Sequence, residues 1–170
     1  MRLLLSLVVG VVAGCGIVMT DGFAGSVTTT LPVHVTVVPQ CAVSANGIEF
    51  GTWSSQAVTG KGTITVTCAQ GVEYHVVLNA GGHFDPATQA RQLAGPNLHH
   101  KLSYRLYQDS SLSIEWGDRG YANSYPTGSG IRGIGTNHPQ PITVYGAIPT
   151  SSVHLPSGSY SDVTLVTIHF

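Results

Sequence analysis

Charged side chains are scarce in this sequence. Only 9% of the 170 residues are charged, and 7 Lys and Arg against 8 Asp and Glu give a formal net charge of -1. A partner such as nucleic acid or an anionic lipid surface needs a concentration of positive charge, and this balance provides no basic face. The length suits one domain with a sizeable core once a targeting segment is removed.

The sequence also lacks the side-chain constellations that enzymes use. Its acidic residues fall in predicted loops or at strand ends, without the spacing of a paired acid and base. The eight His residues are scattered, and the adjacent His99 and His100 would point to opposite faces of an extended segment. The Gly-rich stretch 130–135 contains no Lys-Ser or Lys-Thr pair to hold a phosphate. We therefore predict no enzymatic activity, no cofactor, no metal site and no small-molecule substrate.

The N-terminus carries the features of a targeting segment. A short positive start is followed by an almost wholly apolar run over 3–19, and the small residues Gly22 and Ala24 suit a signal peptidase. We predict that residues 1–24 are a signal peptide. Two other interpretations remain open: a lipobox at 12–15 that would lead to acylation of Cys15, and a permanent transmembrane helix.

Cysteine is rare, with 3 residues in the whole chain. Removal of residues 1–24 leaves Cys41 and Cys68 as an even pair in an oxidising compartment, where a disulfide is the default. On the chain-entropy model such a crosslink contributes roughly 3 to 4 kcal/mol. Two unpaired buried thiols are the alternative, and neither Cys has a second ligand at the spacing of a metal site.

Glycine is abundant, with 21 residues, and many Thr, Val and Ser accompany it, a mixture typical of strands joined by tight turns. Residues 27–37 alternate with period two, as a strand does. One face of this segment carries Val27, Thr29, Leu31, Val33, Val35 and Val37. The segment is about twice as long as a usual strand, so we expect two strands in succession, divided near Pro32.

Short strand patterns continue to the C-terminus. We expect strands at 47–53, 62–68, 72–79, 101–108, 113–116, 141–148 and 160–170, which together with the absence of a convincing helix predict a β-sandwich. Alternation places Ile64 and Val66, and later Val166, Ile168 and Phe170, on the inward side. The stretches 83–100 and 117–140 are predicted to be long surface loops that could carry recognition. Aromatic residues could line a sugar-binding face or belong to the core: Trp53, Tyr104, Tyr107, Trp116, Tyr121 and Tyr125.

Six segments carry a family resemblance. They are Cys41-Ala42-Val43-Ser44-Ala45 with Phe50-Gly51-Thr52; Gly62 through Cys68; Leu102 through Tyr107 with Asp109; Trp116-Gly117-Asp118; Val144-Tyr145-Gly146 with Ile148-Pro149; and Gly158 through Asp162 with Val166 through Phe170. In this order they resemble the spore coat U domain family, whose members include a spore coat protein and subunits of archaic chaperone–usher pili. The resemblance covers essentially the whole chain from Cys41 onward.

The resemblance implies an incomplete immunoglobulin-like β-sandwich completed by a donor strand from another subunit. The implied organisation is a signal peptide at 1–24, a donor segment and first strand at 25–40, and the sandwich domain at 41–170. The implied donor residues are Val27, Thr29, Leu31 and Val33. The strand bearing Val166, Ile168 and Phe170 would border the groove that the donor fills and would contact a chaperone.

The predicted function is therefore a structural subunit, secreted through the periplasm to the cell surface, that polymerises into a pilus or coat. Its expected partners are copies of itself or related subunits, a periplasmic chaperone and an outer-membrane usher. Two alternatives remain open. One is a carbohydrate-binding tip adhesin, and the other is a lipid-anchored coat protein that stays monomeric.

Overall fold

The computed structural model describes residues 25–170, and no helix occurs in this range. No element of this range therefore forms a helix long and apolar enough to cross a membrane. The predicted signal peptide and Cys15 lie outside the described residues. The strands are β1 (Cys41–Asn46), β2 (Val58–Cys68), β3 (Glu73–Leu78), β4 (Arg91–Ala94), β5 (Lys101–Tyr107), β6 (Ile131–Ile134), β7 (Gln140–Ile148) and β8 (Val166–His169).

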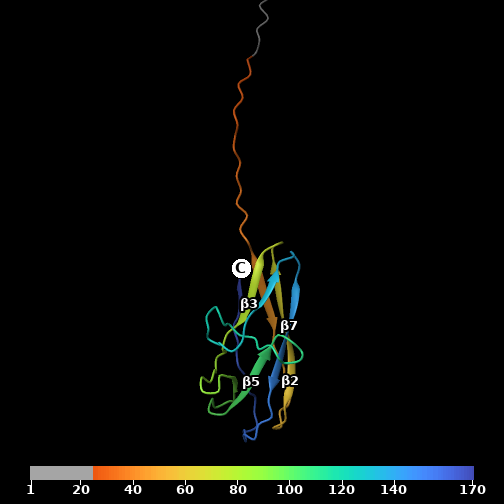
Figure 1. The fold of residues 1–170 in the computed structure, drawn as a ribbon, viewed down its shortest axis with the longest axis vertical. Helices are drawn as coiled ribbons and strands as arrows, with labels where there is room; N and C mark the ends of the chain where they lie inside the picture. The colour runs from red at the N-terminus through yellow and green to blue at the C-terminus, as the bar shows by residue number, and fades with distance from the viewer. Residues whose placement is uncertain (1–24) are drawn as a thin grey trace, which may run out of the picture. The chain divides into compact units, whose positions relative to one another are not determined.

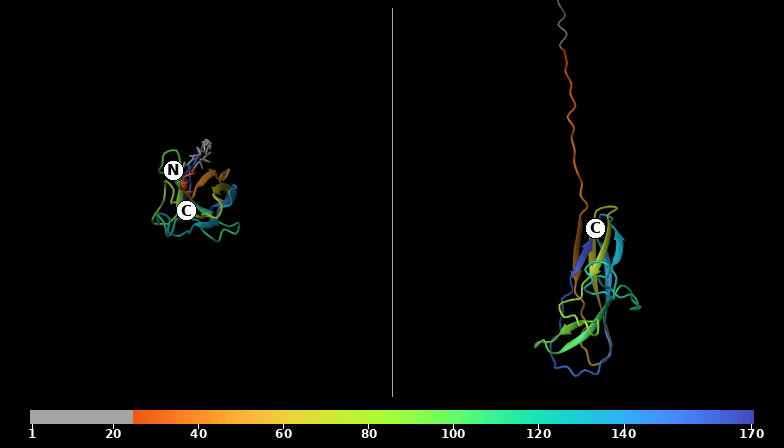
Figure 2. Two further views of the ribbon diagram at one scale, coloured as in Figure 1. Left: turned by 90° about the horizontal axis from the view of Figure 1, so that it is seen from above. Right: turned by 60° about the vertical axis from the view of Figure 1, so that its left-hand side comes forward.

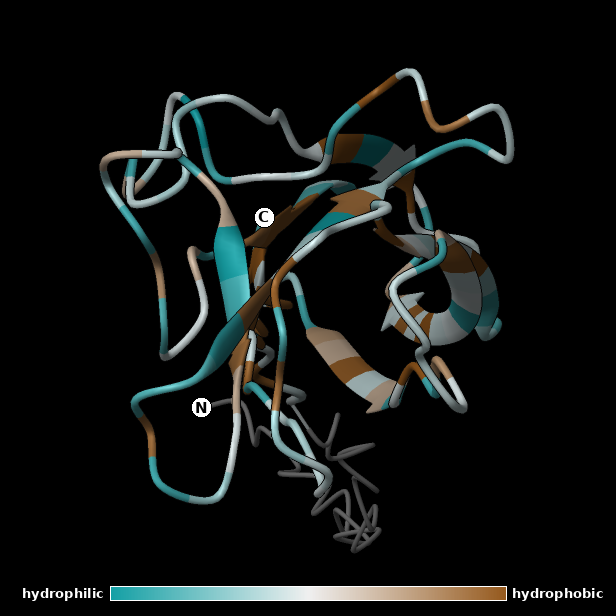
Figure 3. Ribbon diagram, turned by 90° about the horizontal axis from the view of Figure 1, so that it is seen from below, coloured by the Kyte–Doolittle hydropathy of each residue, from teal (hydrophilic) through white to brown (hydrophobic). Residues whose placement is uncertain are grey.

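The strands form two sheets that stack as a sandwich (Figures 1 and 2). The larger sheet has the order β1-β2-β7-β5-β4, and the smaller has the order β6-β3-β8. All six strand pairings are antiparallel. Hydrophobic residues gather on the strands, whereas the loops are largely hydrophilic (Figure 3). The predicted all-β sandwich is confirmed.

Several predicted strand boundaries differ from the structure. Residues 25–40 contain no strand, and the first strand is β1, which begins at Cys41 and not before it. The predicted strand at 47–53 is irregular, because Gly51 has a φ of 69° and turns the chain out of extended geometry. The stretch 113–116 forms only isolated bridges. The final strand is limited to Val166–His169.

Two strands lie where long loops were predicted. β4 and β6 each span four residues and include polar residues and glycine, so they lack the alternation that marks a strand in sequence. β4 pairs with β5, and β6 pairs with β3. Both strands extend the sheets at edges, where pairing to a neighbour determines their conformation more than local pattern does.

The core lies between the two sheets. Ile64 and Val66 are 2% and 0% exposed, which confirms the predicted inward face of β2. Nearer the beginning of β2, Gly60 lies opposite Gly146 of β7. A methyl group added to Gly60 would lie 2.7 Å from the Ile48 side chain, and one added to Gly146 would lie 2.7 Å from the Phe50 ring. The paired glycines therefore form a floor on which Ile48 and Phe50 pack.

A fully buried arginine ties the two sheets together. Arg91 of β4 is 0% exposed and donates hydrogen bonds to the carbonyl oxygens of Leu78 (3.1 Å), Asn79 (2.7 Å) and Trp116 (2.9 Å). Its guanidinium lies 3.8 Å from the centroid of the Tyr125 ring. Burial lowers the pKa of Arg91, and nearby acidic groups act in the opposite direction. Such a group fixes the chain around Trp116, because its removal would leave buried carbonyls without donors.

Cys41 and Cys68 form a disulfide, as predicted. The two residues lie opposite each other in the register of β1 and β2. The bond therefore fastens the beginning of the edge strand β1 to the end of its neighbour.

Candidate functional site

The strand β1 lies at the edge of the larger sheet and exposes the face that should be buried. Val43 lies opposite Val66, and Ala45 lies opposite Ile64. Residues opposite each other in a sheet point to the same side, so Val43 and Ala45 face the interior. Nevertheless Val43 is 42% exposed, and Ala45 is also exposed, although their partners on β2 are buried. The interior side of β1 is therefore uncovered.

The inward side of β8, at the edge of the smaller sheet, is only partly covered. Val166 lies opposite Leu78, and Ile168 lies opposite Val76, both of which are buried. Val166 and Ile168 pack against the core but are only half-buried. Phe170, next on this side, follows the end of β8 and is 59% exposed.

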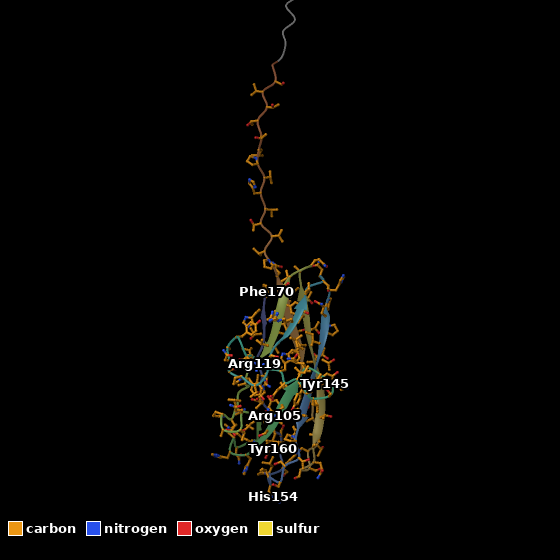
Figure 4. The ribbon with its side chains drawn as sticks, in the orientation of Figure 1. Arg105, Arg119, Tyr145, His154, Tyr160 and Phe170 are labelled. Carbon is orange, nitrogen blue, oxygen red and sulfur yellow. A yellow bond between two sulfur atoms is a disulfide. The ribbon has the colours of Figure 1, made fainter. Side chains whose placement is uncertain are left out.

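The two edge strands run in opposite directions. The beginning of β1 lies beside the end of β2 at the disulfide, and β3 starts after a short turn at the same end of the domain. β8 is antiparallel to β3 and ends beside its beginning, with His169 opposite His75. Figure 4 accordingly places Phe170 and His154 at opposite ends of the sandwich.

The uncovered region continues into a cleft of about 970 Å³ at the end of the domain away from the disulfide. One wall is formed by residues 47–55, which follow β1, and the other by residues 153–162, which precede β8. The apolar lining comes from Ile48, Phe50, Trp53, Leu93, Leu102, Ile148 and Leu155. The groove between the two edges consists of the inward faces of β1 and β8 together with this cleft.

The second wall of the groove is held by Asp162. Its carboxylate accepts hydrogen bonds from the Gly82 amide (2.9 Å) and the Tyr104 hydroxyl (2.8 Å), and its side chain is 1% exposed. His83 Nδ1 lies 3.1 Å from the same carboxylate. Burial, together with the hydrogen bond to Asp162, raises the pKa of Tyr104, although the Thr164 contact acts in the opposite direction. Tyr104 therefore stays protonated and donates to Asp162, which suits a structural tie.

The family model of the Spore Coat Protein U domain matches residues 27–167 of this chain. The chain belongs to the Spore Coat Protein U domain family. This confirms the resemblance noted in the sequence.

Two individual proteins are similar to this Spore Coat Protein U domain. Protein U of Myxococcus xanthus is 27% identical over an alignment of 165 positions, gaps included, and the match covers 86% of this chain and 87% of that protein. A chain from the crystal structure of a chaperone–tip adhesion subunit pre-assembly complex, from the archaic chaperone–usher Csu pili of Acinetobacter baumannii, aligns with a TM-score of 0.57 and 22% identity. The alignment covers 79% of this chain but only 40% of that chain. This likeness supports the predicted incomplete immunoglobulin-like fold.

The structure of this Spore Coat Protein U domain brings only part of the predicted site together. Val166 and Ile168 lie at the groove, as does Cys41, whose disulfide anchors β1. The predicted donor residues show no strand pairing and are strongly exposed, with Val27 at 99%, Leu31 at 85% and Val33 at 85%. Thr29 between them is exposed as well. Their donor role stays a prediction.

Sequence reasoning missed the β1 side of the groove in this family member. Val43, Ala45, Ile48, Phe50 and Trp53 were not assigned to it, because the first strand was expected before Cys41. The alternation of Cys41, Val43 and Ala45 was the available signal.

Three of the six aromatic residues considered for sugar binding belong to the interior of the domain. Tyr104, Trp116 and Tyr125 are buried, at 5%, 0% and 0% exposure. Within residues 25–170, no group of three or more His, Cys, Asp or Glu side chains is arranged to hold a metal ion.

Proposed function

We propose that this chain is a structural subunit of a surface pilus or coat that polymerises by donor-strand exchange after capture by a periplasmic chaperone. The observation that carries the proposal is the pair of opposed edge strands whose inward side chains are exposed on β1 and only half-buried on β8. A groove of this kind accepts an added β-strand, because the strand's backbone can pair with the open edge while alternate side chains fill the interior.

Strand direction favours donation between molecules. Since β1 and β8 run in opposite directions, a strand lying between them is parallel to one and antiparallel to the other. Only residues 34–40 separate the predicted donor segment, which ends at Val33, from β1, whereas a parallel neighbour requires a connection of about a dozen residues or more. A strand that lies parallel to β1 and antiparallel to β8 must therefore come from another molecule.

The composition of the donor segment fits this groove. Its exposed alternating face is apolar, like the uncovered residues of β1 and β8. Burying a side chain such as Leu31 or Val33 contributes about 1.5–3 kcal/mol each. A chaperone would cover the same surface before assembly, with an outer-membrane usher as the later partner, in keeping with the chaperone–usher origin of the similar pilus subunit. The proposal places the chain at the cell surface and involves no enzymatic reaction and no cofactor.

A crosslinking experiment tests donation and its face specificity together. One subunit carries Val43→Cys in the groove, and a second carries a cysteine at one donor position. We expect a mixed disulfide dimer on non-reducing gels with cysteine at one or more of Thr29, Leu31 and Val33, the predicted inward face. Matched cysteines at Thr28 and Thr30, on the opposite face, should crosslink far less.

Equal crosslinking from both faces, or none in assembled material, would show that this segment does not enter the groove. Reduction and reoxidation controls on the wild-type subunit identify any exchange with the native disulfide.

A further inference from the structure

The strand β8 needs support that its own pairing does not provide. It spans four residues, pairs with β3 on one side, and borders the open groove on the other. Short edge strands with one partner are among the first parts of a protein to open. If the groove receives a donor strand, as proposed above, β8 must already be in strand geometry to pair with it.

A tyrosine from a distant loop packs on the outer face of this strand. The ring of Tyr121 stacks on that of His169 at a centroid distance of 4.2 Å and an interplanar angle of 21°. It also lies 5.5 Å from the ring of His75. His75 and His169 are opposite each other on β3 and β8, so one aromatic ring contacts both strands across their junction. Aromatic pairs at such distances contribute about 0.5–1.5 kcal/mol beyond the area they bury.

Hydrogen bonds close the turn that presents Tyr121. The Asp118 carboxylate accepts hydrogen bonds from the backbone amides of Ser124 (3.0 Å) and Tyr125 (2.6 Å), and the Asp118 carbonyl accepts from the Tyr121 amide (3.0 Å). Asp118 itself is 1% exposed. An aspartate side chain that bonds nearby backbone amides in this way stabilises the turn on which Tyr121 lies.

The base of the turn is fixed to the core. Trp116 is 0% exposed; its indole nitrogen donates to the Val76 carbonyl (3.0 Å), and its own carbonyl accepts from buried Arg91 (2.9 Å). In Figure 4, Arg119 marks this loop on the flank of the domain. Arg91 thus fixes Trp116, which the chain joins through Gly117 to Asp118, and the Asp118 carbonyl bonds the Tyr121 amide.

We infer that Tyr121 is a positioning residue that holds β8 against β3 and keeps the groove border formed before a donor strand arrives. We call this contact of Tyr121 with His75 and His169 the clasp. The loop predicted to be a recognition loop acts instead as a strap across the smaller sheet. The benefit of this role to assembly rests on the proposed function. The role itself can be tested without assembly, because the order of β8 can be followed in the free subunit.

Hydrogen exchange of the purified subunit tests the clasp. We expect Tyr121→Ala to accelerate exchange of the Val166–His169 amides by about 2- to 13-fold, the range that one aromatic pair supports. Amides of β2, in the other sheet, should change little, whereas a merely structural loss of global stability would accelerate both. Tyr121→Phe retains the ring and should behave as wild type. Tyr145→Ala, which removes a half-buried tyrosine from the outer face of the larger sheet, is the matched control.

A second variant and a second readout keep the outcomes distinct. His169→Ala removes the stacking partner from the other side and should loosen β8 in the same way. Wild-type exchange at Val166–His169 in both alanine variants would overturn the role of Tyr121. A fluorescent peptide of residues 26–38 should bind the Tyr121→Ala groove more weakly than the wild-type groove. If this peptide fails to bind even the wild-type subunit, donor exchange is in doubt, while the exchange rates still decide the clasp.

Discussion

Replacing Asp162 with alanine tests how the groove wall is held, and its cost can be worked out from the contacts. The wild-type carboxylate is 1% exposed and is bonded by the Gly82 amide and the Tyr104 hydroxyl, with His83 beside it. If each of the three hydrogen bonds to this charged group contributed about 1.5–3 kcal/mol, their loss would cause a very large decrease in the free energy of unfolding.

The alternatives available to each partner reduce that figure. After the change, the Tyr104 hydroxyl still lies 3.0 Å from the Thr164 hydroxyl, and the Gly82 amide still donates to the Val163 carbonyl (3.1 Å). The His83 side chain is 31% exposed and can bond water. Because every donor retains another acceptor, we expect Asp162→Ala to lower the free energy of unfolding by about 2–3 kcal/mol. This is close to the contribution of one hydrogen bond to a charged group.

Urea unfolding of the free subunit with its disulfide intact measures this cost. Glu73→Ala, at an exposed strand position, is the control and should change stability by less than about 0.5 kcal/mol. Asp162→Asn keeps one acceptor oxygen and should fall between the two. A cost for Asp162→Ala that matches the Glu73 control, at an unchanged denaturant slope, would refute the view that this carboxylate holds the wall.

Leu31→Asp should block assembly into fibres or coats, because a charge in the groove costs more than the apolar contact stabilises, whereas Thr30→Asp on the opposite face should assemble; electron microscopy separates them. Gly146→Ala should cost about 1–3 kcal/mol in urea unfolding, since the new methyl group would overlap the Phe50 ring. The raised pKa of Tyr104 means that the unfolded state loses this proton first, so stability should fall as pH rises above about 10. Urea unfolding of Tyr104→Phe across this pH range should show a smaller loss of stability than the wild type. An equal loss in both proteins would exclude a contribution of Tyr104 to the pH dependence.

The parts of the fold that were predictable have strong local patterns. β2, β3, β5 and β7 overlap predicted strands, because each alternates apolar and polar residues over most of its length. The inward sides of β2 and β8 follow from the same alternation. The disulfide followed from the number of cysteines alone, without knowledge of the strand register.

The parts that were not predictable depend on distant partners. β4 and β6 have no alternation, and they are strands because β5 and β3 offer them edges. The wall around Asp162 joins residues about 80 positions apart, such as His83, and no local pattern marks this pairing. The β1 side of the groove was missed for a different reason: the long alternating segment before Cys41 was a stronger strand signal than the short strand after it.

The disulfide at the first residue of β1 determines how the domain bears mechanical load. A pull on residues 25–40 reaches the domain at Cys41, where β1 is paired to β2 alone in the larger sheet. An antiparallel edge strand pulled from its end would otherwise peel away one hydrogen-bonded pair at a time. Because the bond to Cys68 precedes every one of those pairs, tension passes directly into β2, which is held by β7 on its other side. The weakest strand is thereby removed from the path of the force.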